Sequence, residues 1–221
     1  NATPEDIRKL CADVVVYGLH AAFVNPCYVT LAKATLGAHA PVGTALSFPL
    51  GQETISSKQS AANEAVQLGA DELDIVPNLG LFLAGDTQGF LAEMTAIVES
   101  ARMAGKPVVV KFIVECGYFD SLPDAKKQLT DAALLVRKSG ADFVKLSSGM
   151  GPRGVSLEDL KTGKAAVGDS IKIKVAGGVD TRQEAEAFIA AGADRIGTSR
   201  AVEIVTGAIE TKKSSREVTF S

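Results

Sequence analysis

The sequence has no tryptophan, 2 histidines and 3 cysteines in 221 residues, and these shortages exclude several classes of protein. Cys11, Cys27 and Cys116 lack the CxxC spacing of a zinc or redox site, and their odd number does not suit a disulfide framework. We therefore expect reduced thiols in a cytoplasmic protein. His20 and His39 lie in unremarkable surroundings, so we expect no histidine metal centre.

Long apolar runs and an excess of basic charge are absent as well. No apolar run approaches the ~20 residues of a membrane-spanning helix, and we find no cationic, apolar leader that would indicate secretion. The formal net charge is −3, so we expect no basic surface that would indicate nucleic-acid binding. The length suits one large or two small domains, and we predict a single domain over residues 1–221.

The phrase Gly-Ala-Asp recurs at residues 69–71, 140–142 and 192–194. Each copy follows an amphipathic stretch and precedes an apolar run, which predicts a glycine-ended helix followed at once by a strand. We interpret the phrase as punctuation and not as a binding motif. The predicted strands are Ala21–Asn25, Gly43–Phe48, Glu72–Pro77, Val108–Glu115, Phe143–Ser147, Ile171–Ala176 and Arg195–Thr198.

Amphipathic stretches between these strands predict helices over Ser56–Leu68, Phe90–Ala104, Asp124–Ser139, Ser156–Val167 and Arg182–Ala191. Another helix is predicted to begin after Thr3, and Ser156 and Thr181 are predicted caps. Strict alternation of helices with near-continuous apolar strands predicts a parallel sheet that is covered on both faces.

Two architectures have this pattern: an open doubly wound sheet and a closed (β/α)8 barrel. No Gly-x-Gly-x-x-Gly turn follows the first strand, and polar residues gather at the carboxyl ends of several strands. We therefore predict an α/β fold of the (β/α)8 TIM barrel type. Since a barrel needs eight strands, we expect the first strand to be missing from this sequence, before Asn1. The alternatives are an incomplete barrel or an overlooked strand at 13–16.

Lys145 and Lys174 lie in strands too apolar to hold a solvated charge, just before small residues and glycine. Burial disfavours the ammonium form and lowers the pKa from a model value of ~10.4. A lysine tuned in this way is an amine nucleophile for Schiff-base formation with a carbonyl substrate. A lysine whose amine extends to the rim, or is held by a carboxylate, is the alternative. Two such lysines on successive strands favour a functional role over this structural alternative.

Two further strands carry buried charges. Asp74 lies among leucine, isoleucine and valine, so it needs a partner such as a lysine of a neighbouring strand. That pair is either structural or a proton shuttle beside an amine nucleophile. To Lys111, in the middle of its strand, we assign the structural role of neutralising a carboxylate inside the barrel.

Glycines follow each of the last three strands: Gly149, Gly177 with Gly178, and Gly197 two residues before Ser199. Loops after the final strands of such barrels often bind phosphate through backbone N–H groups. The sequence therefore predicts a phosphate site at these loops.

Six segments, in this order and spacing, make the chain resemble the deoxyribose-phosphate aldolase family of class I, metal-independent aldolases on a (β/α)8 barrel. They are residues 24–29, 48–51, 69–74, 140–145, 176–179 and 195–199. The resemblance implies that Lys145 forms the Schiff base, that Lys174 perturbs it and transfers protons, and that Asp74 belongs to the proton relay. It also implies reversible cleavage of 2-deoxy-D-ribose 5-phosphate to D-glyceraldehyde 3-phosphate and acetaldehyde, without cofactor or metal, in a homodimer.

The chain departs from the family in four places. The family's first strand precedes the point where this chain begins. Its usual threonines, directly after the Schiff-base lysine and again two residues later, are Leu146 and Ser148 here, and we interpret Leu146 as removing a hydroxyl from beside the site. Its usual arginine after Gly-Gly-Val is Asp180, and Arg200 replaces a serine; we hypothesise that Arg200 supplies the phosphate cation or pairs with Asp180. The tail, Glu217–Ser221, lacks the tyrosine of some members, so we assign it no catalytic role.

These departures keep other functions open. Leu146 and Asp180 are compatible with a Schiff-base aldolase that acts on another aldehyde. A catalytically inactive relative that serves as a binding protein is a second alternative. A phosphate-binding barrel isomerase is a third, but it leaves the paired lysines unexplained.

Overall fold

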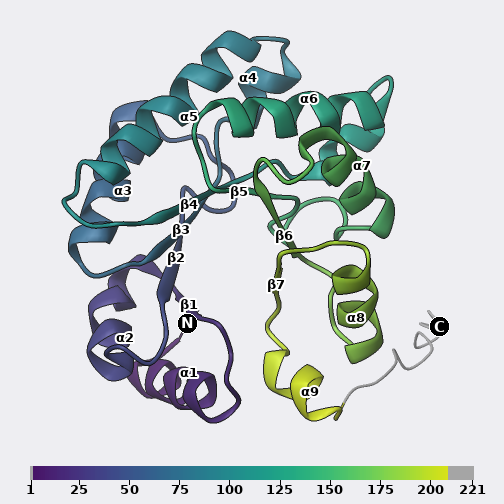
Figure 1. Cartoon of the computed structure of the whole chain (residues 1–221). Helices are drawn as coiled ribbons and strands as arrows, with labels where there is room; N and C mark the ends of the chain where they lie inside the picture. Colours follow the sequence, from purple (N-terminus) through teal and green to yellow (C-terminus); the bar gives the residue numbers. More distant parts are fainter. Residues whose placement is uncertain (1, 209–221) are drawn as a thin grey trace, which may run out of the picture.

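The structure is a computed structural model that describes residues 2–208, and its centre is a curved sheet of seven parallel strands. The strands pair in chain order (Figure 1). They are β1 (Ala22–Val24), β2 (Val42–Leu46), β3 (Glu72–Ile75), β4 (Val109–Ile113), β5 (Phe143–Lys145), β6 (Lys172–Ala176) and β7 (Arg195–Gly197).

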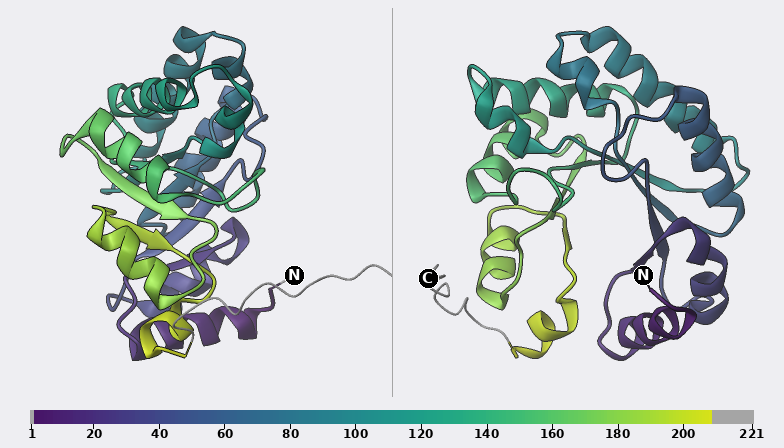
Figure 2. Two further views of the ribbon diagram at one scale, coloured as in Figure 1. Left: turned by 90° about the vertical axis from the view of Figure 1, so that its right-hand side faces the viewer. Right: turned by 180° about the vertical axis from the view of Figure 1, so that it is seen from behind.

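The helices lie on the outside of the sheet (Figure 2). The α-helices are α1 (Pro4–Val16), α2 (Val29–Leu36), α3 (Ile55–Gln67), α4 (Leu79–Leu83), α5 (Thr87–Arg102), α6 (Ala125–Lys138), α7 (Leu157–Val167), α8 (Arg182–Ala190) and α9 (Ala201–Thr206). Two 3₁₀ helices are η1 (Pro26–Tyr28) and η2 (Cys116–Ser121). No helix within residues 2–208 is long and apolar enough to cross a membrane.

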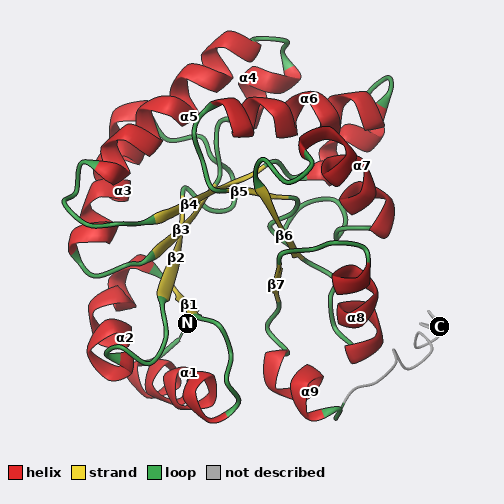
Figure 3. Ribbon diagram, viewed as in Figure 1, coloured by secondary structure: helices red, strands yellow, loops and turns green. Residues whose placement is uncertain are grey.

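Pairing in chain order confirms winding of the barrel type, because the strand order of a doubly wound sheet reverses at a switch point. Within residues 2–208, β1 pairs with β2 and β7 pairs with β6, so the sheet is open between β1 and β7 (Figure 3). An eighth strand before Asn1 stays a prediction. The suggested strand at 13–16 is wrong, because Ile7, Cys11 and Val14 are buried at helical spacing in α1.

The Gly-Ala-Asp phrase is punctuation, and its aspartate has a structural function that the sequence did not indicate. The three glycines have φ of 114°, 84° and 97°, a left-handed backbone that glycine adopts without strain. Each aspartate accepts an N–H from the preceding strand at 2.8 to 2.9 Å, in the pairs Asp71 with Val42, Asp142 with Val110, and Asp194 with Ile173. The phrase thus ends one helix and joins two strands.

Most differences from the predicted elements lie at strand ends. Four strands end two residues or more before their predicted ends. After β2 and β4, the residues Ser47 and Glu115 have φ values of 52° and 48°, which turn the chain out of the sheet. Thr3, Ser156 and Thr181 cap their helices as predicted, and the capping box of Ser156 is completed by Asp159. Helices α2, α4 and α9 were not predicted, since they are short. The predicted tail, Glu217–Ser221, lies outside the described residues.

Candidate active site

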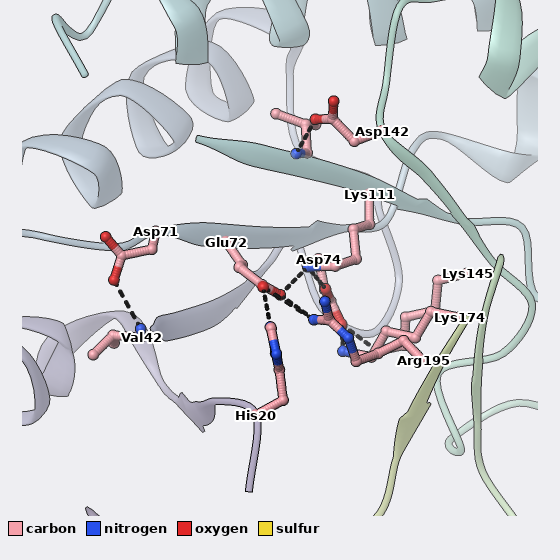
Figure 4. Close-up of polar contacts among 11 residues, drawn as sticks. His20, Val42, Asp71, Glu72, Asp74, Lys111, Asp142, Lys145, Lys174 and Arg195 are labelled. Carbon is pink, nitrogen blue, oxygen red and sulfur yellow. Dashed lines mark hydrogen bonds and ion pairs between the residues drawn. The ribbon is translucent and has the colours of Figure 1, made fainter. Parts of the chain in front are cut away.

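Two lysines from neighbouring strands meet one aspartate inside the sheet. Lys145 ends β5 and is paired in register with Lys174 of β6, so their side chains stand side by side. The Oδ2 atom of Asp74, on β3, accepts hydrogen bonds from Lys145 Nζ at 2.8 Å and from Lys174 Nζ at 2.6 Å (Figure 4). Asp74 is fully buried, and the lysines are 7% and 3% exposed. The three predicted catalytic side chains are therefore in direct contact.

Small and aromatic neighbours shape the space around these amines. A Cβ added at Gly197 would lie 3.0 Å from Lys174 Cε, so glycine at this position leaves room for the lysine stem. The Lys174 Nζ atom lies 3.7 Å from the centre of the Phe23 ring, and Lys145 Nζ lies 5.9 Å from that of Phe48. Aromatic faces attract ammonium groups at such distances. The sequence reasoning missed both phenylalanines.

A second charged group lies beside the first and is centred on Glu72, the first residue of β3. Its carboxylate accepts from Lys111 Nζ at 2.6 Å and from Arg195 Nη1 at 2.8 Å, and His20 Nε2 lies 2.8 Å from Oε1. Lys111 Nζ also lies 3.1 Å from Asp74 Oδ1, which joins the two groups. Lys111 thus neutralises carboxylates, as predicted. We had expected unremarkable surroundings for His20, and this expectation is wrong. The fold brings His20 into contact with Glu72, which lies 52 positions away in the sequence.

Cations outnumber carboxylates in this interior. Burial alone would raise the pKa of Asp74, but the surrounding lysine ammonium groups outweigh it and hold that pKa below its ordinary value. At Glu72 burial is likewise outweighed, chiefly by Lys111, and the pKa is lowered to about 2. Burial lowers the pKa of Lys174 to about 8, against the opposing effect of Asp74. A lysine with a pKa of about 8 can both bind and release a proton near neutral pH.

A cavity of about 1110 Å³ extends from these lysines to the loops that follow β5, β6 and β7. Its lining includes five of the predicted phosphate-binding residues: Gly149, Gly177, Gly178, Gly197 and Ser199. Gly177 and Gly178 have φ of 80° and 83°, and a Cβ added at Gly177 would lie 2.7 Å from Gly149 Cα. The first two loops therefore pack backbone against backbone, which requires glycine.

Arg200, the sixth predicted phosphate-binding residue, does not line this cavity. It lies at the rim, where its Nε is 3.8 Å from Asp180 Oδ1, and Asp180 itself lines the cavity. The structure therefore agrees with the hypothesis that Arg200 pairs with Asp180. Residues 2–208 contain no group of three histidine, cysteine, aspartate or glutamate side chains placed to hold a metal ion.

The two residues that replace the family's threonines behave differently. Leu146 is fully buried and lies outside the cavity, with its Cδ2 3.5 Å from the place of a Cβ at Gly163 of α7. Its side chain therefore packs beneath a helix and takes no hydroxyl from the cavity, contrary to our interpretation, since alternation turns it away from Lys145. Ser148 does line the cavity, and its N–H donates to buried Glu115 at 3.0 Å.

Comparison with known proteins identifies the family of this chain. The family described as DeoC/LacD family aldolase matches residues 2–210. The chain belongs to this aldolase family. It is 40% identical to a deoxyribose-phosphate aldolase of Thermoanaerobacter sp. (strain X514), over 93% of this chain and 90% of the relative. It is 39% identical to one of Treponema denticola, over 93% of each.

Solved structures of aldolases have the same fold. A deoxyribose-phosphate aldolase of Aeropyrum pernix, described as tetrameric, is 31% identical, with a TM-score of 0.82 over 93% of this chain and 84% of that one. A structure described as QR15, an aldolase, is 34% identical, with a TM-score of 0.85 over 92% of this chain and 88% of that one. The aldolase family therefore accounts for the curved parallel sheet of this chain.

Proposed function

We propose that this chain cleaves 2-deoxy-D-ribose 5-phosphate reversibly to D-glyceraldehyde 3-phosphate and acetaldehyde, through a Schiff base on Lys145. The observation that carries the proposal is the buried contact of two lysine amines with one aspartate oxygen beside the cavity. Relatives at about 40% identity named deoxyribose-phosphate aldolase support the choice of substrate.

Lys145 is the nucleophile in this proposal. Its neutral amine adds to the C1 aldehyde of the open-chain sugar and water leaves, which gives an iminium ion. The C2–C3 bond then breaks, its electron pair flows into the iminium to give an enamine, and the C3 hydroxyl loses its proton. D-Glyceraldehyde 3-phosphate leaves, the enamine takes a proton at C2, and water releases acetaldehyde and the free amine.

Asp74 and Lys174 are assigned the movement of these protons. Asp74 Oδ2 is hydrogen-bonded to both lysines, so a continuous path joins the nucleophile to the second amine. The lowered pKa of Lys174, about 8, suits a group that both gives and takes a proton near neutral pH.

The substrate phosphate is assigned to the glycine loops. Gly149, Gly177, Gly178, Gly197 and Ser199 line the cavity at the carboxyl ends of the last three strands, where barrels often bind phosphate. Arg200 supplies a cation at the rim. A homodimer and a cytoplasmic location, both suggested by the sequence, stay predictions, as does a single domain over residues 1–221.

Borohydride trapping tests the Schiff base. Incubation with acetaldehyde followed by reduction is expected to add one ethyl group to the peptide that carries Lys145. The Lys145→Leu variant is expected to lose this adduct, whereas Lys172→Leu, which removes an exposed lysine of β6, is expected to keep it.

The outcomes separate the alternatives. Absence of an adduct in the unmodified chain would contradict every Schiff-base function. An adduct without turnover of 2-deoxyribose 5-phosphate would contradict the proposed substrate and favour an aldolase for another aldehyde.

A further inference from the structure

The phosphate end of the cavity contains a carboxylate. Asp180 follows Gly178 by two residues, lines the cavity, and has a side chain that is 40% exposed. Its charge faces the space that we assign to the substrate phosphate. Two anions this close repel each other, so Asp180 opposes the binding of a phosphate.

The same carboxylate pairs with a cation of the neighbouring loop. Arg200 Nε lies 3.8 Å from Asp180 Oδ1, and the two residues come from the successive loops after β6 and β7. Both side chains are close to half exposed, so the pair is weak and is open to a competitor. A phosphate, with up to two charges, is such a competitor.

Within residues 2–208, other sources of positive charge near these loops already have partners. The backbone N–H groups of Asp180 and Thr181, just before α8, donate to Glu184 Oε2 at 2.9 and 3.1 Å. The four lysines and arginines that line the cavity, among residues 2–208, contact other carboxylates: Lys9 with Asp13, Arg195 with Glu72, and Lys145 and Lys174 with Asp74. Arg200 belongs to one of these loops and its pair is half exposed, so a phosphate bound at the loops can replace its partner.

We propose that Asp180 determines specificity by competing with the substrate phosphate for Arg200. This competition lowers the preference of the enzyme for a phosphorylated aldose over a neutral one. The inference rests on the proposed function, because it concerns the phosphate end of the same cavity. It makes Asp180 and Arg200 one unit, whose net charge sets the preference.

A double-mutant cycle tests the unit. The quantity measured is kcat/KM for 2-deoxyribose 5-phosphate divided by kcat/KM for 2-deoxyribose, at low salt. Asp180→Asn is expected to raise this ratio about tenfold and Arg200→Met to lower it about tenfold, as expected for one charge close to a phosphate. The double variant restores a net charge of zero and is expected to return the ratio to that of the unmodified chain.

Two controls accompany the cycle. Asp169→Asn removes the same charge from a fully exposed side chain between α7 and β6, at the other end of the sheet, and is expected to leave the ratio unchanged. Trapping of acetaldehyde, which carries no phosphate, reports whether each variant keeps its site.

An unchanged ratio in Asp180→Asn, or a double variant that matches Arg200→Met, would overturn the inference. With turnover intact, these outcomes leave the proposed function standing. Absence of any turnover or adduct in the unmodified chain would instead reject both.

Discussion

At the scale of single residues, the proposed Schiff-base chemistry depends on an excess of buried positive charge around Asp74. Asp74 holds two amines, and Lys111 adds a third on its other oxygen. The two carboxylates, Asp74 and Glu72, cannot neutralise the four cations of this interior, so loss of a proton from one amine relieves repulsion. Phe23 and Phe48 enclose the amines without supplying a further negative charge.

Replacement of Lys174 tests the proton relay. Lys174→Leu is expected to lower kcat on the order of 10²- to 10⁴-fold, the usual contribution of a positioned acid or base, with a smaller effect on substrate binding. Because its pKa is about 8, the unmodified enzyme is expected to lose kcat/KM above about pH 8, where Lys174 is no longer a proton donor.

The pH profile separates this role from a structural one. The fall above about pH 8 is expected to disappear in Lys174→Leu and to persist in the matched Lys172→Leu variant. Persistence of the same fall in Lys174→Leu would show that another group causes it.

At the scale of elements, a buried ion pair between two helices holds the loop that carries Phe48. Lys58 of α3 donates to Glu93 of α5 and to the carbonyl of Gly51, and both charged residues are 1% exposed. Glu93 also accepts the N–H of Asn78, just after β3, at 3.3 Å. The pair therefore ties two loops at the rim of the sheet to the outer helices.

Loss of one partner leaves a buried charge without compensation. Lys58→Met is expected to lower the free energy of unfolding by about 3–5 kcal/mol, measured by urea denaturation. The apolar double variant Lys58→Met with Glu93→Leu is expected to recover most of that loss.

The matched control is an exposed pair on α6, Lys127 with Asp131. Lys127→Met is expected to leave the unfolding free energy nearly unchanged, because exposed ion pairs contribute little. Equal losses from Lys58→Met and Lys127→Met would contradict a structural role for the buried pair.

At the scale of the whole molecule, Glu72 connects the two ends of the open sheet. It contacts His20, just before β1, and Arg195, the first residue of β7, although these strands do not pair within residues 2–208 (Figure 4). Lys111 of β4 completes the connection. Ionic side-chain contacts thus connect β1 and β7, which no backbone hydrogen bonds join within residues 2–208.

The lowered pKa of Glu72 makes this connection sensitive to pH. A group whose pKa falls on folding contributes stability above its unfolded value of about 4.5, and that contribution is lost as the pH falls toward the folded value of about 2. The shift corresponds to roughly 3 kcal/mol. Glu72→Gln is therefore expected to destabilise the chain more at pH 7 than at pH 3.

Urea unfolding at both pH values measures the difference. Glu99→Gln, which removes an exposed carboxylate of α5, is the control and is expected to have little effect at either pH. An equal loss of stability from Glu72→Gln at the two pH values would contradict the role of its ionised form.

The sequence by itself determined the seven parallel strands, the longer helices between them and the burial of Lys145, Lys174 and Asp74, because these follow from local periodicity and from the Gly-Ala-Asp punctuation. The resemblance to aldolases then supplied the expected roles. Contacts between residues 71 and 100 positions apart, which join Asp74 to Lys145 and Lys174, were decided by the tertiary structure alone. The same holds for the Glu72 group, the burial of Leu146 beneath α7 and the place of Arg200 at the rim. Local pattern states which face of a strand is buried, but the curvature and register of the sheet decide which side chains meet.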